Sequence, residues 1–418
     1  MSQRTKRRRV SSEQETVDGL AQDPKASVDT IWCPATTAEK ESWNGFCEIE
    51  SEPALFNVML REFGVKGVKV QEVISLDDEM LAFLSKPVYG LIFLFRWRAD
   101  DPDKQEATCP EQLWFANQTA NNACASVALL NIVNNIEGID LGENLQSFKI
   151  FTKDFTPALR GDAINNFEFV KRIHNSFARK MDMLNSDLHL KNEAESKRSR
   201  SSKNGNDSED SEDGGFHFIA FVPVDGKIWK FDGLERQPQD LGEYSQDDWL
   251  ELVKPNILTR MAEYEEDQIE FSILSLAKDP LIDLTAKLAV NVKCLRLVRE
   301  LIDAHEEGSS TAEPAASLLE NTILGPDASY ALTQDNIGEA VIAADQREEY
   351  QACSIDALIQ HLQKLSGNQL ELRASIKEEQ QSNQADDDYA AGRRYDYGPA
   401  VRQWVRFLAR KRMFESLE

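Results

Sequence analysis

The sequence lacks an apolar stretch long enough to cross a membrane. Its longest apolar run covers residues 88–95, far short of the roughly 20 residues that a membrane-spanning helix needs. The basic N-terminus is not followed by an apolar stretch of the kind found in secretion signals. We therefore expect a soluble protein of the cytoplasm and nucleus that does not contact membranes.

Cysteine is sparse, and its spacing excludes two common structural roles. No two cysteines stand at the short spacing that holds zinc, and their density is too low for a disulfide scaffold. We therefore predict reduced, intracellular thiols. The six cysteines are Cys33, Cys47, Cys109, Cys124, Cys294 and Cys353.

Positive charge is also under-represented. The chain has 47 Lys and Arg against 72 Asp and Glu, a formal net charge of -25. Such a balance argues against direct binding of nucleic acid and favours basic protein partners. The exception is a basic cluster at residues 6–9, in a polar tail that we expect to be disordered over residues 1–40. Clusters of this kind are typical of nuclear import signals and also of solvated tails.

Residues 41–279 have the pattern of one mixed α/β domain. Residues 54–63 carry helical apolar spacing, and residues 88–95 read as a buried strand. A stretch rich first in Lys, Arg and Ser and then in Asp and Glu interrupts the domain at residues 183–215. It is too polar to pack, so we predict a disordered loop.

A helical extension is predicted for residues 280–380. Leu281, Leu288, Leu295 and Ile302 recur every seven residues, and Asn291 interrupts the apolar seam. The repeat is too short for an independent coiled coil, so we expect it to pack on its own domain or on a partner. Residues 305–337 show no strong period, and residues 338–380 indicate another helix.

The last segment, residues 381–418, is predicted to hold a mobile polar linker over 381–392 and a helix that begins near Pro399. Val401, Trp404, Val405 and Leu408 fall on one face of this helix. An apolar face this far from the main domain suggests a docking site for a partner protein.

Cys124 is the first candidate for chemistry. It stands at the start of an apolar helix predicted over residues 123–136, with Asn121 and Asn122 placed to cap the helix. A helix N-terminus and a neighbouring imidazole are the usual means of turning a thiol into a nucleophilic thiolate. The alternative is a small buried residue with no chemical role.

His217 and Asp232 flank a predicted β-hairpin. A two-residue turn at Asp225-Gly226 pairs positions whose numbers add to 451, so Asp232 faces Ile219 and lies diagonal to His217 on the same face. A carboxylate in that place can orient a catalytic imidazole. The alternatives are a bulge at Pro223 that would separate the two side chains, a structural histidine, and a turn aspartate.

Gln118 completes the set of candidates. It lies six residues before Cys124, where its amide could stabilise an oxyanion together with the backbone N–H of Cys124. A glutamine before a helix is also commonly an exposed polar residue. From the residues alone, the sequence predicts a Cys-His-Asp hydrolase with no specified substrate.

Six short motifs extend this interpretation. In chain order they are EIESEP (48–53), PVYGLIFLF (87–95), QTANNACA (118–125), HNSFAR (174–179), FHF (216–218) and DGL (232–234). Together they resemble the ubiquitin C-terminal hydrolase family, in its larger members with a C-terminal helical tail. The resemblance covers about residues 43–279 and is weak beyond them.

The resemblance implies a papain-like α/β (α+β) fold, in which helices flank a central antiparallel sheet and a crossover loop at residues 183–215 spans the active site. It places the nucleophile on Cys124, the general base on His217, the orienting acid on Asp232 and the oxyanion donor on Gln118. It also implies cleavage after the last glycine of ubiquitin through a thioester, with no metal or cofactor.

The resemblance further implies ubiquitin and its conjugates as partners. Residues 393–408 resemble a short element, Arg-Arg-x-x-Tyr and an amphipathic helix, that docks such enzymes on activator or scaffold subunits at the proteasome or on chromatin. The implied role is ubiquitin-dependent protein turnover or chromatin regulation. Two alternatives are a non-catalytic ubiquitin-binding scaffold that recruits partners through this helix, and an unrelated peptide-cleaving cysteine protease.

Overall fold

The computed structural model describes residues 33–98, 100–201, 215–244, 249–263, 271–305, 319 and 321–411, with side chains in 180–201 described as far as residue 191. The basic cluster at residues 6–9 and the part of the predicted loop at 202–214 lie outside these residues. Within the described part of the chain, no helix is both long and apolar enough to span a membrane.

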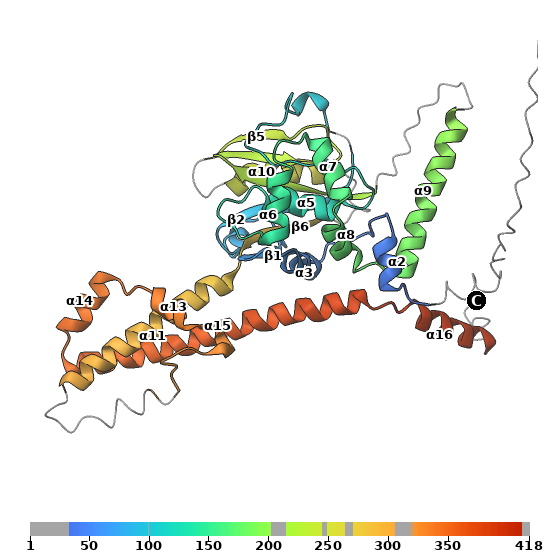
Figure 1. Ribbon diagram of the computed structural model, residues 1–418. Coiled ribbons are helices and arrows are strands. Elements are labelled where there is room, and N and C mark those ends of the chain that lie inside the picture. The colour runs from blue at the N-terminus through green and yellow to red at the C-terminus, as the bar shows by residue number, and fades with distance from the viewer. Residues whose placement is uncertain are drawn as a thin grey trace, which may run out of the picture.

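One antiparallel sheet forms the centre of the main domain (Figure 1). Its six strands run in the order β1-β6-β2-β3-β4-β5, and every neighbouring pair is antiparallel. The predicted strand at 88–95 is confirmed as a central strand, which explains its nearly continuous apolar character. The strands are β1 (Val68–Glu72), β2 (Val88–Arg96), β3 (Phe216–Val224), β4 (Lys227–Phe231), β5 (Gln239–Glu243) and β6 (Ser272–Lys278).

Helices cover both faces of this sheet, because alternate residues of each strand point to opposite sides. In β3, Phe218 and Ala220 join the core on one face, whereas Ile219 and Phe221 join the core on the other. The larger core packs against α3 (Pro53–Phe63), α5 (Cys124–Val133), α6 (Gly142–Phe151), α7 (Pro157–Asn165) and α8 (Glu168–Asn175). The smaller core packs against α4 (Asp78–Leu81) and α10 (Trp249–Ala262). The predicted mixed α/β class is confirmed.

The C-terminal helical extension is also confirmed, and it projects from the domain as a rod (Figure 1). In the rod, α11 (Pro280–His305) lies along α15 (Ile355–Arg394), and Leu288, Leu295 and Ile302 of the predicted seven-residue repeat are buried there. Two short helices, α13 (Gln334–Glu339) and α14 (Ala344–Ala352), precede α15 in place of the single helix predicted over 338–380.

A buried polar contact fixes the register of α11 against α15. The amide of Asn291 donates to the carbonyl oxygen of Leu365 at 3.0 Å, and the amide of Gln369 donates to Asn291 Oδ1 at 3.1 Å. Sliding one helix along the other would leave these groups unpaired in an apolar environment. The polar interruption noticed in the sequence is therefore a register device.

Three boundary predictions are wrong. Residues 381–392 are not a linker, because they lie inside the 40-residue helix α15, where Asp387 and Glu379 form ion pairs with Arg61 and Lys69 of the main domain at 2.5 Å each. Residues 183–201 belong to α9 (Lys180–Ser201), a stretch without glycine or proline. The N-terminal tail becomes ordered before residue 40, since α2 (Thr37–Ser42) starts with a capping box between Thr36 and Glu39.

Replacing Asn291 with alanine should lower the free energy of unfolding of the extension by about 1–3 kcal/mol, because it leaves the amide of Gln369 and the carbonyl of Leu365 short of a partner. Urea unfolding followed by circular dichroism measures the loss. Lys287→Ala, at an exposed position of the same helix, is the matched control, and an equal effect of both substitutions would contradict the register role.

Candidate active site

Cys124 is the first residue of α5, a helix whose other residues are all buried. It is a free thiol and is partly exposed. The predicted caps are wrong: no side chain caps this helix, because Asn122 adopts a left-handed conformation with φ of 61° and donates its amide to the carbonyl oxygen of Phe46. The first backbone N–H groups of α5 are thus not covered by a side-chain cap.

His217 and Asp232 are in contact, as the strand register expected from a two-residue turn at Asp225-Gly226 predicts. Strands β3 and β4 pair in the predicted register, with Pro223 opposite Ile228 and no bulge between them. His217 Nε2 lies 2.7 Å from Asp232 Oδ1, and both side chains are only 4% exposed. Because Nε2 faces the carboxylate, Nδ1 is the ring nitrogen left for the hydrogen bond with Cys124.

The two partners hold His217 in its charged form. Burial by itself lowers the pKa of His217, but the hydrogen bonds with Asp232 and Cys124 and the charges of these groups raise it from 6.5 to about 9. Burial likewise opposes ionisation of Asp232, and the hydrogen bond from His217 outweighs it and lowers the pKa of the carboxyl. At neutral pH the site contains an imidazolium–carboxylate pair.

Both oxygens of Asp232 are occupied, which fixes the plane of the carboxylate. Oδ1 also accepts the backbone N–H of Leu234 at 2.9 Å, and Oδ2 accepts the indole N–H of Trp97 at 3.2 Å. Sequence reasoning missed Trp97. The available signal was its position directly after the long buried strand β2, whose last residue pairs with the first residue of β3.

Gln118 packs against the turn that carries Asp232. Its backbone N–H donates to the carbonyl oxygen of Gly233 at 2.8 Å. A Cβ on Gly233 would lie only 3.0 Å from the Cβ of Gln118, so this close approach favours glycine. Among the described residues, the buried Oε1 of Gln118 has no hydrogen-bond partner.

The four candidate residues are brought together around one cleft of about 1180 Å³. Cys124, His217 and Gln118 line it, and Asp232 stands behind His217. Its walls come from the segment before α3, the first turns of α9 and the end of α15. The wall residues include Glu48, Glu50, Ser51, Asp182, Asn185 and Arg393.

A second histidine supports helix α5 without lining the cleft. His174 is fully buried, and its Nε2 lies 2.7 Å from the carbonyl oxygen of Cys47 while its Nδ1 lies 2.8 Å from the hydroxyl of Ser126. Burial lowers its pKa to about 4. A neutral ring must donate from Nε2 and accept at Nδ1, so His174 ties α5 to the segment around Cys47.

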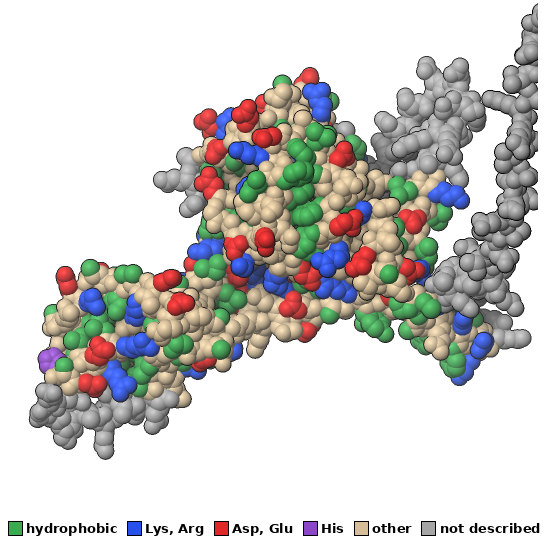
Figure 2. All heavy atoms as spheres, viewed as in Figure 1, with side chains coloured by type: hydrophobic (Ala, Val, Ile, Leu, Met, Phe, Trp, Pro, Cys, Tyr) green, Lys and Arg blue, Asp and Glu red, His purple; other side chains and the backbone are tan. Residues whose placement is uncertain are grey.

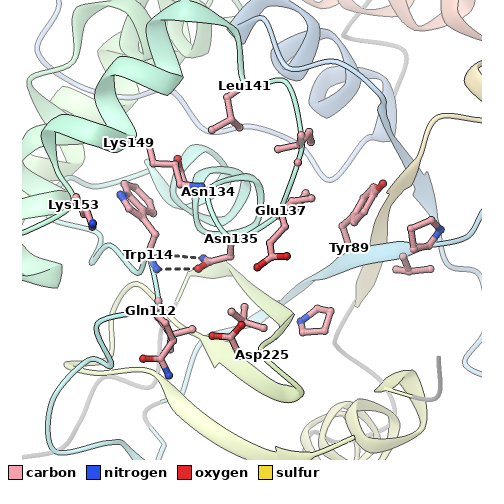
Figure 3. A pocket seen from close by; sticks show the side chains of 18 of the residues that line it. Tyr89, Gln112, Trp114, Asn134, Asn135, Glu137, Leu141, Lys149, Lys153 and Asp225 are labelled. Carbon is pink, nitrogen blue, oxygen red and sulfur yellow. Dashed lines mark hydrogen bonds between the residues drawn. The ribbon is translucent and has the colours of Figure 1, made fainter. Parts of the chain in front are cut away.

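Another cavity, of about 1000 Å³, lies away from these residues (Figure 3). Tyr89, Trp114, Lys149 and Lys153 line it, and the side chain of Asn135 exchanges two hydrogen bonds with the backbone of Trp114. None of the four candidates reaches it. The described residues also contain no cluster of three or more His, Cys, Asp or Glu side chains that could hold a metal ion.

Comparison with known proteins gives the context of this site. Residues 46–262 match the family model described as ubiquitin carboxyl-terminal hydrolase, family 1. The chain is 38% identical over 251 residues to ubiquitin carboxyl-terminal hydrolase isozyme L5 of Dictyostelium discoideum, covering 60% of this chain and 66%, just under two thirds, of the relative. It is 34% identical over 235 residues to ubiquitin carboxyl-terminal hydrolase 2 of Schizosaccharomyces pombe, covering 55% and 72%.

More distant similarity extends to ubiquitin carboxyl-terminal hydrolase BAP1 of Xenopus tropicalis, with 31% identity over 306 residues, covering 66% of this chain and 42% of the relative. Among solved structures, the Trichinella spiralis UCH37 catalytic domain bound to ubiquitin vinyl methyl ester is 32% identical, with a TM-score of 0.45, covering 56% of this chain and 96% of that chain.

An NMR titration of the histidine rings tests the electrostatics of the site. We expect His217 to keep its proton up to about pH 9 and His174 to stay neutral down to about pH 4. Asp232→Asn should lower the pKa of His217, because the hydrogen bond and charge of the carboxylate are lost while burial remains. Asp240→Asn, on the neighbouring strand β5, should leave the pKa of His217 unchanged, and an equally high pKa in Asp232→Asn would exclude the carboxylate as a source of the shift.

Proposed function

We propose that this chain, which belongs to ubiquitin carboxyl-terminal hydrolase family 1, is a deubiquitinating cysteine hydrolase that cleaves the bond after the C-terminal glycine of ubiquitin. The family model covers just over half of the chain. One observation carries the proposal: the buried His217–Asp232 pair engages the partly exposed thiol of Cys124 at the start of α5.

In the proposed reaction the Cys124 thiolate attacks the carbonyl carbon after the last ubiquitin residue. The amide of Gln118 and the backbone N–H of Cys124 stabilise the oxyanion. His217 then donates its proton to the leaving amine, and a thioester forms. A water molecule, deprotonated by His217, hydrolyses the thioester, while Asp232 keeps the imidazole oriented throughout. A non-catalytic ubiquitin-binding scaffold has no need of this buried charge pair.

Labelling with a ubiquitin that carries a C-terminal electrophile tests this function. The probe should form a covalent adduct at Cys124, and Cys124→Ala should abolish the adduct without unfolding the protein, because the partly exposed thiol forms no disulfide. Intact mass spectrometry and peptide mapping identify the site. Absence of an adduct on folded wild-type protein, with its activator present, would contradict the proposal.

The role of Gln118 has its own test. Gln118→Ala should reduce kcat on a ubiquitin C-terminal fluorogenic amide by about 100-fold, because an oxyanion donor is lost, with a smaller change in KM. Gln112→Ala, an exposed glutamine of the same segment, is the matched control. Equal kcat values for the two variants would remove Gln118 from the mechanism.

The C-terminal helix α16 (Gly398–Arg410) is the proposed docking element for an activator or scaffold subunit. None of its residues is buried, and Val401, Trp404, Val405 and Phe407 are between 45% and 64% exposed. Figure 2 shows apolar side chains beside basic ones where α16 lies. An isolated exposed apolar face of this size favours a protein partner. The partner would place the enzyme in protein turnover at the proteasome or in chromatin regulation, in the cytoplasm and nucleus.

Replacing Trp404 with alanine should reduce the recovery of proteasomal or chromatin-associated subunits in affinity purification at least about tenfold. A large aromatic side chain that becomes buried on binding commonly contributes much of the binding energy of such an interface. Quantitative mass spectrometry of the purified complexes provides the measurement. Leu370→Ala removes a similarly exposed side chain (63%) from α15 and should have no effect. Unchanged recovery with Trp404→Ala would exclude α16 as the docking element.

A further inference from the structure

The end of the C-terminal extension forms part of the active-site cleft. Arg393, next to the last residue of α15, is only 8% exposed and lines the same cleft as Cys124 and His217. Its neighbours along the cleft wall include Glu50 and Asp182. A residue of the extension therefore completes a site whose chemistry lies in the main domain.

One guanidinium joins three separate segments of the main domain. Arg393 Nε donates to the carboxylate of Glu50 at 2.8 and 3.0 Å, and Nη1 donates to the carbonyl oxygen of Phe177 at 2.7 Å. Nη1 and Nη2 both donate to Asp182 Oδ2 at 3.1 Å. Glu50 precedes α3, Phe177 follows α8, and Asp182 lies in the first turn of α9. Only the planar fork of an arginine reaches all three at once.

The contact of Arg393 with Asp182 also involves the first turn of α9. Asp182 Oδ2 also accepts the backbone N–H of Arg179 at 2.9 Å, so the residue bound by Arg393 is itself part of the helix start. The backbone N–H of Lys180 donates to Asp396, two residues beyond the end of α15, at 3.2 Å. Residues 393–396 thus hold the N-terminus of α9, the helix that lines one side of the cleft.

The adjacent Arg394 anchors α15 to the main domain through a separate set of contacts, away from the cleft. Arg394 donates to Ser176 Oγ at 3.0 Å and to the carboxylate of Glu62 at 2.7 and 2.8 Å, and its guanidinium lies 4.6 Å from the centre of the Phe177 ring. Arg394, Ser176 and Glu62 do not line the cleft. Two neighbouring arginines therefore divide the roles of holding the helix and shaping the cleft.

We propose that Arg393 is a positioning residue for ubiquitin binding, which fixes the Glu50 segment and the first turn of α9 at the spacing that admits the substrate. This inference rests on the proposed function. The hydrogen bonds of Arg393 go to Glu50, Phe177 and Asp182 and not to Cys124 or His217, so it acts on the bound substrate through these walls. Its loss weakens ubiquitin binding and leaves the chemical step intact.

The test combines kinetics and binding on the full chain. Arg393→Ala should raise KM for a ubiquitin C-terminal fluorogenic amide about tenfold and change kcat less than about twofold, as expected when binding rather than transition-state stabilisation is lost. In the inactive Cys124→Ala background, adding Arg393→Ala should raise the Kd for ubiquitin by the same factor. Arg393→Lys should restore part of the affinity, because an ammonium can bind one carboxylate but cannot bridge both. Arg394→Ala is the matched control.

A double-mutant cycle separates positioning from direct contact with ubiquitin. If Arg393 acts through the wall, Asp182→Ala raises KM by a similar factor and the double variant is no worse than either single variant. Additive effects, an unchanged KM in Arg393→Ala, or an equal rise in Arg394→Ala would overturn the inference. Should Arg393→Ala not fold, Arg393→Lys and Asp182→Ala carry the same comparison. A wild-type protein that does not hydrolyse ubiquitin substrates would instead overturn the proposed function.

Discussion

The buried ion pair between His217 and Asp232 is the constraint around which the rest of the main domain is arranged. Two ionised groups that are each 4% exposed are costly unless every strong hydrogen-bonding position is filled. The hairpin register brings the two side chains to 2.7 Å, and Trp97 and Leu234 occupy the remaining positions on the carboxylate. The end of β2, the start of β3 and the end of β4 must therefore lie side by side. The N-terminus of α5, which bears Cys124, must face them.

The two buried histidines show how partners, rather than burial alone, decide charge. Both are desolvated, yet the pKa of His217 rises to about 9 beside a carboxylate, whereas that of His174 falls to about 4 between a hydroxyl and a carbonyl. His217 stabilises the folded chain fully below pH 6.5, and this contribution is lost as the pH rises through about 9. His174 acts in the opposite direction: it costs stability as the pH falls from 6.5 towards 4, where only the unfolded chain takes up the proton.

The sequence could predict the parts of the site that follow from local rules. A two-residue turn sets strand register, so the position of Asp232 relative to His217 followed from counting, and an apolar helix start placed Cys124 in the first turn. The contacts of Trp97, His174 and Arg393 could not be predicted in this way, because each joins segments 48 or more residues apart. Helix α15 was misread for the same reason: its polar residues 381–392 look solvated until their partners in the main domain are known, which are Arg61 of α3 for Asp386 and Asp387 and Lys69 of β1 for Ser382.

The C-terminal extension and the main domain are therefore coupled more closely than a domain with an appended tail. Most of the ion pairs that hold α15 to the main domain are partly exposed, and such pairs contribute little individually. Arg393 differs because it is buried and removing it would leave the carboxylate of Asp182 with one fewer partner in a partly buried position. Only residues 395–397 separate the end of α15 from α16. Helix α16 is thus connected through a short segment to a side chain in the cleft wall, and this connection gives a contact made on α16 a physical route to the cleft.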